Sequence, residues 1–498
     1  MMDDREKSDG LVVPQKLSNN AQGGVAEMVE GSGPAKGNTA SEPRSGRRAG
    51  QGASNALDRV RHIAAQDKEA RFTALLHHID VGRLRAAYFA LRPKAAPGVD
   101  GVTWADYGTD LEENLRDLHG RVHRGAYRAR PSRRVLIPKP DGRQRPLGVA
   151  SLEDKILQRA VVEVLSAIYE QDFLGFSYGF RPGRSPHHAL DALAVGIVGK
   201  KVNWVLDADF SDYFSSLDHR WLERFLEHRI ADQRVLRLIQ KWMAAGVIEN
   251  GSWTAFEQGV PQGASASPLL ANVYAHYVLD LWAHQWRTRH ARGDVIIVRW
   301  ADDFVVGFED REDAERFWAD LRDRLAKFGL ELNADKTRLI EFGRFAARDR
   351  KARGLGKPET FRFLGFTHVC AKTRKSGRFK LKRITDSKRV RAKLLAVKDE
   401  MARRRHLPIP EQGRWLARVL QGHFNYYAVP DNIKALNAFR HEIIRHWLKS
   451  LRRRSQRNRM TWQRMECLAD RWLPTPRILH PWPGQRFAAS TQGRSPVR

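Results

Sequence analysis

Cysteine is scarce in this sequence, and long apolar runs are absent. Only two of the 498 residues are cysteine, which excludes a disulfide framework, and Cys370 and Cys467 lie too far apart in sequence to suggest a zinc module. No segment reaches the roughly 20 apolar residues of a membrane span. The first ten residues, MMDDREKSDG, lack the apolar core of a secretory signal. These absences predict a cytoplasmic protein without a membrane partner.

Basic residues are abundant, and their distribution is uneven. Lys and Arg number 87 against 57 Asp and Glu, a formal charge of +30. Residues 371–498 hold 32 of the basic and 8 of the acidic residues, a net of +24, which leaves +6 for the rest of the chain. A single charge run is most often a solvated helical face, but this concentration predicts that the C-terminal quarter binds nucleic acid. The residues expected to contact RNA or DNA are Lys380, Lys382, Arg383, Lys388, Arg389, Arg391, Arg452, Arg453 and Arg454.

The pattern of apolar residues predicts an α+β chain with several parts. Residues 1–55 are rich in Gly, Ser, Asn and Ala and are expected to form a disordered leader. Helical stretches alternate with short β-type runs up to about residue 366, and the pattern beyond residue 380 is helical. Residues 456–498 form a basic segment whose last part, rich in Pro, Gly and Ser, is expected to be an extended arm. A core-facing stripe at helical spacing consists of Leu436, Phe439, Ile443, Trp447 and Leu451.

Acidic residues stand where buried strands are expected to end. Residues 203–208 (NWVLDA) form a strand-like run that leads into Asp209. Two further apolar runs, DVIIVRW and FVVGF, are separated only by Ala301, Asp302 and Asp303. So short a connection predicts a hairpin with a carboxylate pair at its tip. By itself, an Asp-Asp turn is most often ordinary turn chemistry.

A second strand that ends in Asp209 changes this interpretation, because it supplies a third carboxylate. Mg²⁺ prefers oxygen ligands and keeps several waters, so two or three carboxylates and substrate phosphates suffice to hold it. Two such ions about 3.5 to 4 Å apart activate an attacking hydroxyl and stabilise a leaving pyrophosphate. The pattern therefore predicts nucleotidyl transfer with two Mg²⁺ ions. We expect Asp302 to bridge the metals with Asp209, and Asp303 to be less direct.

Around these carboxylates the chain carries a series of motifs in a fixed order. They are APGVDGVTW, IPKPDGRQRPLGVASLEDKILQRAV, FSYGFRPGRSPHHAL, VLDADFSDYFSSLDH, QGVPQGASASPLLANVY, RWADDFVVGF, GLELNADKTRLIEFG, FRFLGF and GHFNYYAVPDN. In this order they resemble the reverse transcriptases with maturase that group II introns encode. The resemblance implies a right-hand polymerase. Its expected parts are an N-terminal helical extension at 56–130, fingers and a palm with a small antiparallel sheet at 131–370, and an α-helical thumb or maturase domain X at 371–455.

The resemblance also implies roles for individual residues. Asp209, Asp302 and Asp303 match the catalytic carboxylates. Lys336 in NADKT matches a lysine proposed as proton donor to the departing pyrophosphate, a role that calls for a lowered pKa. From the residues alone, a structural alternative stays open for several positions. The alternatives are a solvated lysine for Lys336, a solvated basic hairpin for Lys139 and Arg145, a helix cap for Asp212 and a core residue for Phe214. The residues expected at the incoming dNTP are Lys139, Arg145, Asp212, Phe214 and Gln262.

Three of these side chains have a physical reason for their implied role. Lys139 and Arg145 suit a triphosphate as a point cation and a planar fork. Phe214 would pack under the sugar, where its ring would collide with a 2′-OH and favour deoxynucleotides. One departure is Trp300, where the family usually has Tyr, so the ring is kept and the phenolic hydroxyl is lost.

By resemblance, the expected reaction is RNA-directed DNA synthesis on an RNA template and DNA primer duplex. The expected partners also include dNTPs, the structured intron RNA whose splicing is supported, and target DNA for retromobility. The expected setting is the bacterial cytoplasm near the nucleoid, and no HNH endonuclease is expected after domain X. Two alternatives are an RNA-binding splicing cofactor with an idle polymerase site, and a group II-like polymerase used in antiviral defence or beside CRISPR integrases.

Overall fold

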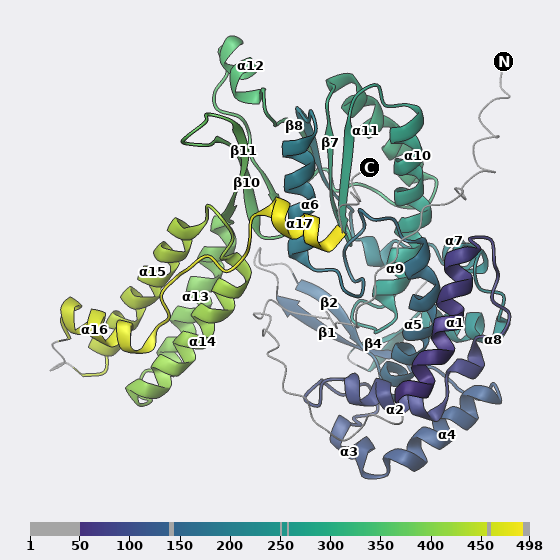
Figure 1. Cartoon of the computed structure of the whole chain (residues 1–498). Coiled ribbons are helices and arrows are strands. Elements are labelled where there is room, and N and C mark those ends of the chain that lie inside the picture. The colour runs from purple at the N-terminus through teal and green to yellow at the C-terminus, as the bar shows by residue number, and fades with distance from the viewer. Residues whose placement is uncertain (1–49, 139–143, 250, 256–257, 456–459, 492–498) are drawn as a thin grey trace.

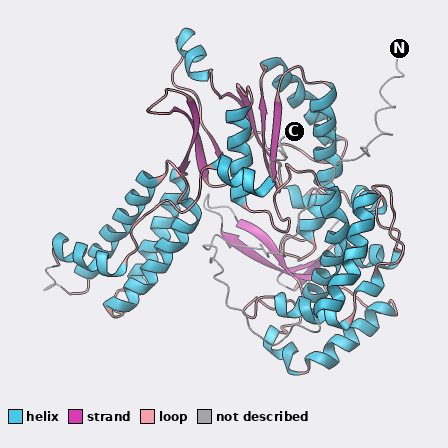
Figure 2. Ribbon diagram, viewed as in Figure 1, coloured by secondary structure: helices cyan, strands magenta, loops and turns pink. Residues whose placement is uncertain are grey.

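A computed structural model describes residues 50–138, 144–249, 251–255, 258–455 and 460–491 (Figure 1). It is an α+β structure in which many helices surround three small sheets (Figure 2). The expected leader at 1–55 lies outside the described residues except for its C-terminal end, which is helical because α1 begins at Gly50. Among the described helices, none combines the length and apolar character needed to cross a bilayer.

The first part of the described chain is helical and packs against α5. Asp80 caps α2 by accepting a hydrogen bond from the Arg83 backbone N–H, and Thr103 and Asp106 form a capping box at α3. The buried faces of α1, α2 and α4 share one core with α5. The elements are α1 (Gly50–Gln66), η2 (Leu76–His78), α2 (Val81–Ala90), α3 (Trp104–Thr109), α4 (Leu111–His123) and α5 (Leu152–Asp172).

A four-stranded sheet in the order β2-β1-β4-β5 follows. Its strands are β1 (Ser132–Pro138), β2 (Gln144–Val149), β4 (Val247–Glu249) and β5 (Ser252–Thr254). β1 pairs with β2 in antiparallel register and with β4 in parallel register. The pairing places Arg145 opposite Ile137, near the end of the hairpin where the two strands are connected.

The central sheet is antiparallel and has the order β6-β7-β3-β8. Its strands are β3 (Trp204–Asp209), β6 (Val295–Trp300), β7 (Asp303–Phe308) and β8 (Arg338–Glu341). Alternate residues face opposite sides, so Leu206 and Val306 join the large core that includes α5, whereas Val205 and Val305 pack with α6. The expected strand before Asp209 and the expected hairpin are both confirmed.

Helices cover both faces of this sheet (Figures 1 and 2). The α6 helix lies on one face, and α9, the π-helical turn η4 and α11 supply buried residues to the core on the other. Their bounds are α6 (Pro186–Gly199), η3 (Tyr213–Ser215), α7 (His219–Glu227), α8 (Gln233–Ala244), α9 (Ser267–Ala275), η4 (His276–Asp280), α10 (Leu281–Arg289) and α11 (Arg311–Ala326).

A third sheet leads from the central body to a helical bundle. The strands β9 (Phe361–Phe363), β10 (Phe366–Lys372) and β11 (Phe379–Thr385) pair in antiparallel fashion in the order β11-β10-β9, and α12 (Ala346–Ala352) precedes them. β10 runs across residue 370, so the expected boundary between residues 370 and 371 falls inside a strand. The change in charge along the sequence therefore does not coincide with a structural boundary.

The bundle contains α13 (Ser387–Arg403), α14 (Ile409–Tyr427), α15 (Ile433–Arg452) and α16 (Trp462–Trp472) around one core. The expected stripe on α15 is fully buried there, from Leu436 to Leu451. Met465 and Ala469 of α16 belong to the same core, so the bundle extends beyond the expected boundary at residue 455. The apolar side chains of α16 make it part of the bundle, although the segment around it is strongly basic.

The chain after α16 returns to the central body (Figure 1). The backbone N–H groups of Leu479 and His480 donate to the Ala428 carbonyl at the end of α14. A final helix, α17 (Pro483–Thr491), then lies against α6. We call residues 473–491 the C-terminal strap. The expected extended arm, residues 475–498, is therefore correct for 475–482 and wrong for α17, where the segment from Pro483 is helical. Its last residues, 492–498, lie outside the described part of the chain.

Candidate active site

Asp302 and Asp303 lie at the tip of the β6–β7 hairpin. Trp300 pairs with Asp303, so only Ala301 and Asp302 form the connection. Ala301 has a φ of +55°, as two-residue hairpin turns require. The turn thus projects two consecutive carboxylates from one end of the central sheet.

Asp209 is brought to the same place by strand register. The last residue pair between β3 and β7 is Asp209 opposite Asp303, and directly opposed residues in antiparallel strands have Cβ atoms about 5 Å apart. Asp209 is buried, Asp302 is half-buried, and Asp303 keeps solvent access. Strand register sets Asp303 opposite Asp209 and Asp302 in the adjoining turn. That Asp302 bridges the metals with Asp209, with Asp303 less direct, stays a prediction.

Lys336 is the cationic partner of this cluster. Its ammonium group donates to Asp209 Oδ2. The Asn333 backbone N–H donates to the Asp209 carbonyl at 2.8 Å, which fixes the NADKT turn beside the strand end. Burial lowers the pKa of Lys336, but the contact with Asp209 outweighs it and the pKa is raised overall. The lowered pKa that a proton donor calls for is not what this arrangement produces.

The carboxylates repel one another. Protein atoms packed around Asp303, together with the charges of Asp302 and Asp209, raise its pKa to about 8. Burial and the neighbouring Asp209 also raise the pKa of Asp302, while the nearby charges of Arg145 and Lys336 oppose that rise. Close carboxylates in partly desolvated surroundings retain their charge only when cations share the site.

The chemistry of these donors fits a divalent cation. Asp209, Asp302 and Asp303 offer only oxygen ligands, which Mg²⁺ prefers, and a positive charge already lies against Asp209 in the form of Lys336. Across the described ranges, no three His, Cys, Asp or Glu side chains are grouped tightly enough to make a ready metal cage. Lys336 contacts Asp209 Oδ2, so a cation that binds this oxygen has to share it with the ammonium group or displace that group.

The structure describes the surroundings of three further expected dNTP-site residues, of which Arg145 lies near the carboxylates. Arg145 of β2 lies close enough for its charge to act on Asp302. The Gly148 backbone N–H donates to the Gln262 carbonyl at 2.7 Å, so the PQG turn is joined to the same strand as Arg145. Phe214 is partly buried, and its ring stands edge-on to Phe180 at 6.3 Å.

The remaining two dNTP-site expectations have different outcomes. Asp212 is exposed, has a φ of +42° and makes no side-chain cap to the short helix that follows, so the capping alternative is not observed. Its carbonyl accepts hydrogen bonds from the Ser215 N–H and the Ser216 hydroxyl. Lys139 lies outside the described residues.

The basic residues expected to contact nucleic acid divide into three groups. Lys388, Arg389 and Arg391 are exposed on α13. On β11, Lys380 pairs with Asp431 at 2.7 Å and Lys382 is half-buried. At the end of α15, the Arg452 side chain donates to the Met460 carbonyl and the Arg454 side chain donates to the Leu407 carbonyl. Arg453 between them is exposed. Arg383 is a correction, because it is buried and pairs with Asp191 of α6 at 2.8 Å.

Two functional candidates were missed from the sequence. Arg299 and Asp280 form a buried ion pair directly behind the Asp302 turn. The available signal was an arginine inside the apolar run VIIVRW and an aspartate inside the apolar helix that precedes it. Nothing in the sequence indicated that these two residues, or Ser177, would meet.

Known proteins share much of this chain. The family model described as reverse transcriptase (RNA-dependent DNA polymerase) matches residues 137–368, a range that holds Arg145, Asp209, Asp302 and Lys336. Protein YkfC of Escherichia coli (strain K12) is 34% identical over 311 residues, which make up 55% of this chain and 81% of that protein.

Two other relatives are named for introns. Group II intron-encoded protein LtrA of Lactococcus lactis subsp. cremoris is 37% identical over 233 residues, 45% of this chain and 38% of that protein. A 91 kDa protein in the cob intron of Schizosaccharomyces pombe is 41% identical over 146 residues, 29% of this chain and 18% of that protein. The chain thus spans most of YkfC and less than half of the two intron proteins.

Proposed function

The chain belongs to the reverse transcriptases of the group II intron type, and from that membership we propose that Asp209, Asp302 and Asp303 are the catalytic centre of its RNA-directed DNA polymerase activity. The observation that carries the proposal is the register of the central sheet, which sets Asp209 opposite Asp303 with Asp302 in the adjoining turn. The three carboxylates come from two separate motifs, and strand pairing alone brings them together.

The parts of the molecule take the roles of a right-hand polymerase in this proposal. The sheet of β1, β2, β4 and β5 supplies the fingers, the central sheet with its helices is the palm, and the α13–α16 bundle is the thumb or domain X. Residues 56–130 form the N-terminal helical extension. The shared core of α13–α16 supports a thumb that ends near residue 472 rather than 455.

The reaction joins the primer 3′-OH to the α-phosphate of a dNTP, with pyrophosphate as the leaving group. Reverse transcriptases use divalent metal ions, and two Mg²⁺ held by Asp209, Asp302 and Asp303 supply activation of the hydroxyl and charge stabilisation of the pyrophosphate. Arg145 and Lys139 bind the triphosphate, while Gln262 and Asp212 line the nucleotide site. Lys336 enters protonated because of Asp209, so it can donate its proton to pyrophosphate only after it leaves that carboxylate.

The nucleic-acid partners follow from charge and from the relatives. Exposed Lys388, Arg389 and Arg391 on α13 contact the phosphates of the template-primer duplex and of structured intron RNA. LtrA is named as a group II intron-encoded protein, which supports a maturase role in intron splicing and, through DNA synthesis at a target site, in retromobility. Arg383 does not belong to this surface, because its side chain is paired with Asp191.

The deciding experiment is primer extension on an RNA template with the purified protein. Asp302→Asn is expected to lower the rate by about 100-fold or more, because it removes a charge that holds the metal. Asp323→Asn, at an exposed position of α11, is the matched control and should leave the rate within about twofold.

Binding of intron RNA by the same variants separates the two functions. Asp302→Asn is expected to bind RNA as the wild type does. Full polymerase activity in Asp302→Asn would refute the catalytic assignment. A wild-type protein that binds intron RNA and promotes splicing without extending a primer would support the splicing cofactor with an idle site.

A further inference from the structure

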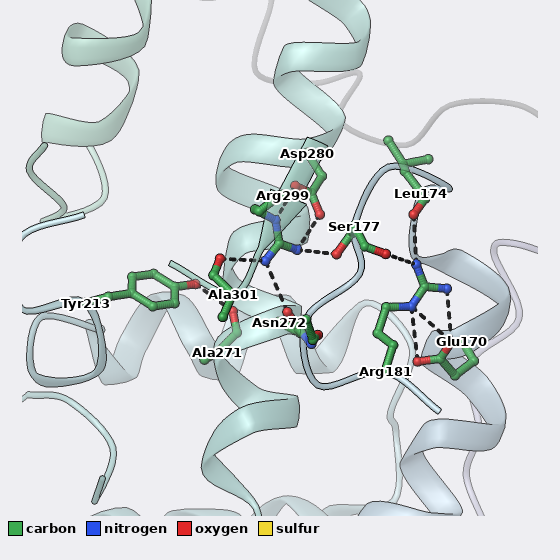
Figure 3. Close-up of polar contacts among 11 residues, drawn as sticks. Glu170, Leu174, Ser177, Arg181, Tyr213, Ala271, Asn272, Asp280, Arg299 and Ala301 are labelled. Carbon is green, nitrogen blue, oxygen red and sulfur yellow. Dashed lines mark hydrogen bonds and ion pairs between the residues drawn. The ribbon is translucent and has the colours of Figure 1, made fainter. Parts of the chain in front are cut away.

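Behind the catalytic turn, Arg299 forms a hydrogen-bond network that leaves none of its donors unused (Figure 3). Its Nε and Nη2 atoms donate to the two carboxylate oxygens of Asp280 at 2.7 and 2.6 Å. Nη2 also donates to Ser177 Oγ at 2.7 Å, and Nη1 donates to Asn272 Oδ1 at 3.1 Å. A guanidinium carries five N–H donors, and the fifth is directed at the backbone of the catalytic turn.

That fifth hydrogen bond runs from Nη1 to the carbonyl of Ala301 at 3.0 Å. The carbonyl belongs to the peptide that joins Ala301 to Asp302, and Ala301 has the positive φ that a non-glycine residue seldom adopts. A residue in such a conformation persists only where its surroundings determine it. Arg299 therefore holds the peptide that precedes Asp302, and rotation of this peptide would redirect the Asp302 carboxylate.

The other side of the turn is held by Gly179. A Cβ atom there would lie 2.3 Å from the Ala301 nitrogen, so the backbones touch. Asn272 Nδ2 donates to the Gly179 carbonyl at 2.8 Å, which ties this contact to the Arg299 network. The Tyr178 backbone N–H donates to the Arg299 carbonyl at 2.9 Å. The turn is thus enclosed between Arg299 and the loop around Gly179.

Ser177 extends the network to a second buried arginine (Figure 3). Its carbonyl accepts a hydrogen bond from Arg181 Nη1 at 2.8 Å, and Arg181 also binds the Leu174 carbonyl and the Glu170 carboxylate. A buried ion pair contributes little net stability compared with an apolar replacement. Two buried arginines that both bind Ser177 are better explained by the positioning of its loop than by a gain in stability.

We propose that Arg299, anchored by Asp280, is a positioning residue that sets the Asp302 and Asp303 carboxylates for cation binding. It touches neither substrate nor metal and acts through the Ala301 peptide. This inference rests on the proposed function of the carboxylates and adds a residue on the opposite face of the sheet. It also accounts for Asn272 and Ser177, whose side chains complete the arginine's hydrogen bonds.

The test compares Arg299→Lys with Arg229→Lys. Arg229 is an equally buried arginine that pairs with Asp172 and donates to the carbonyls of Ala64, Asp67 and Ala70, between the N-terminal helices and α5. Lysine keeps the charge in both variants but cannot reproduce the planar fork. Each variant is measured for Mn²⁺ affinity by electron paramagnetic resonance without substrate, and for kcat and the dNTP KM in primer extension.

The proposal expects a weakening of Mn²⁺ binding by about tenfold and a fall of kcat by about 100-fold in Arg299→Lys, with KM changed less than kcat. Arg229→Lys should lower the melting temperature to a similar extent and leave Mn²⁺ affinity within about twofold of the wild type. Ser177→Ala, which removes a single acceptor, serves if Arg299→Lys fails to fold, and it should weaken Mn²⁺ binding by a smaller factor.

Mn²⁺ affinity and kcat at wild-type values in Arg299→Lys, or equal losses in Arg229→Lys, would overturn the positioning role. With Ser177→Ala, an unchanged Mn²⁺ affinity would overturn it too. The Mn²⁺ measurement needs no turnover, so a wild-type protein that fails to extend primers would refute the proposed function while this comparison still decides the role of Arg299.

Discussion

At the residue scale, the environment of Phe214 suggests how the nucleotide site is shaped. Val260 donates its backbone N–H to the Phe214 carbonyl at 2.8 Å, and a side chain at Gly259 would lie 2.8 Å from that carbonyl oxygen. On its other side stands Phe180, held at a φ of +59°. The Phe214 backbone is thus fixed by these contacts, and its ring is bordered on one side by Phe180.

Phe214→Val is expected to increase incorporation of ribonucleotides relative to deoxynucleotides by about tenfold or more, because the shorter side chain leaves room for a 2′-OH. Competing dNTP and rNTP in single-nucleotide primer extension measures the ratio. Phe345→Val, at an exposed position before α12, is the control. An unchanged ratio in Phe214→Val would show that Phe214 is only a core residue.

At the element scale, α15 holds the helical bundle together. Trp447 is completely buried, and its indole N–H donates to Gln412 Oε1 of α14 at 2.9 Å. Gln412 Nε2 in turn donates to the carbonyls of Arg404, Arg405 and Leu407, which close the turn between α13 and α14. The Gln412 side chain of α14 thus links α15 to the turn between α13 and α14.

Trp447→Ala is expected to destabilise the bundle by about 3 to 5 kcal/mol, through the cavity and the lost partner of Gln412. Hydrogen exchange should rise across α13–α16 and stay unchanged in the central sheet. Trp253→Ala, at a mostly exposed position of β5, is the control and should affect the bundle little. Uniform exchange over the whole chain would mean that the bundle is not a separate unit.

The elements also show what a sequence can predict. β3, β6 and β7 could be predicted because apolar β-type runs end at acidic residues, and the buried stripe of α15 follows from its helical spacing. The basic segment 344–358 carries no clear helical pattern, yet it contains α12, and Arg350 of α12 and Arg353 just after it pair with Glu341 of β8. Local composition does not reveal such tertiary partners.

In the candidate site, too, local motifs could be predicted and contacts between distant residues could not. The three carboxylates were predictable because their motifs are local. The network behind them was not, because Arg299 meets Asp280 and Ser177 only through folding. Arg383 was misassigned for the same reason. A basic residue in a basic segment is expected on the surface, and only the position of Asp191 on α6 explains its burial.

At the scale of the whole molecule, the C-terminal strap joins the bundle to the central sheet and its helices. Asp191 of α6 is fully buried and accepts ion pairs from Arg383 of β11 and Arg486 of α17. Arg486 also contacts His480, which in turn bonds to the Asn425 carbonyl of α14 at 2.8 Å. One carboxylate therefore connects α6, the third sheet and the strap.

Arg486→Ala is expected to lower the free energy of unfolding by about 2 kcal/mol, because a charged hydrogen bond to buried Asp191 is lost. Products of primer extension should become shorter, since the bundle is held less firmly against the central body. Addition of the first nucleotide should stay within about twofold. Arg477→Ala, at an exposed position of the same strap, is the control. Full-length products from Arg486→Ala would refute the coupling.

The double pairing of Asp191 also bears on how the protein is made. A ribosome completes α6 nearly three hundred residues before it reaches Arg486, which supplies the second counter-ion. Nascent chains that terminate early would bury this carboxylate with one arginine instead of two. Such fragments are expected to be open to proteases, so defective copies of the enzyme would be removed before they occupy RNA.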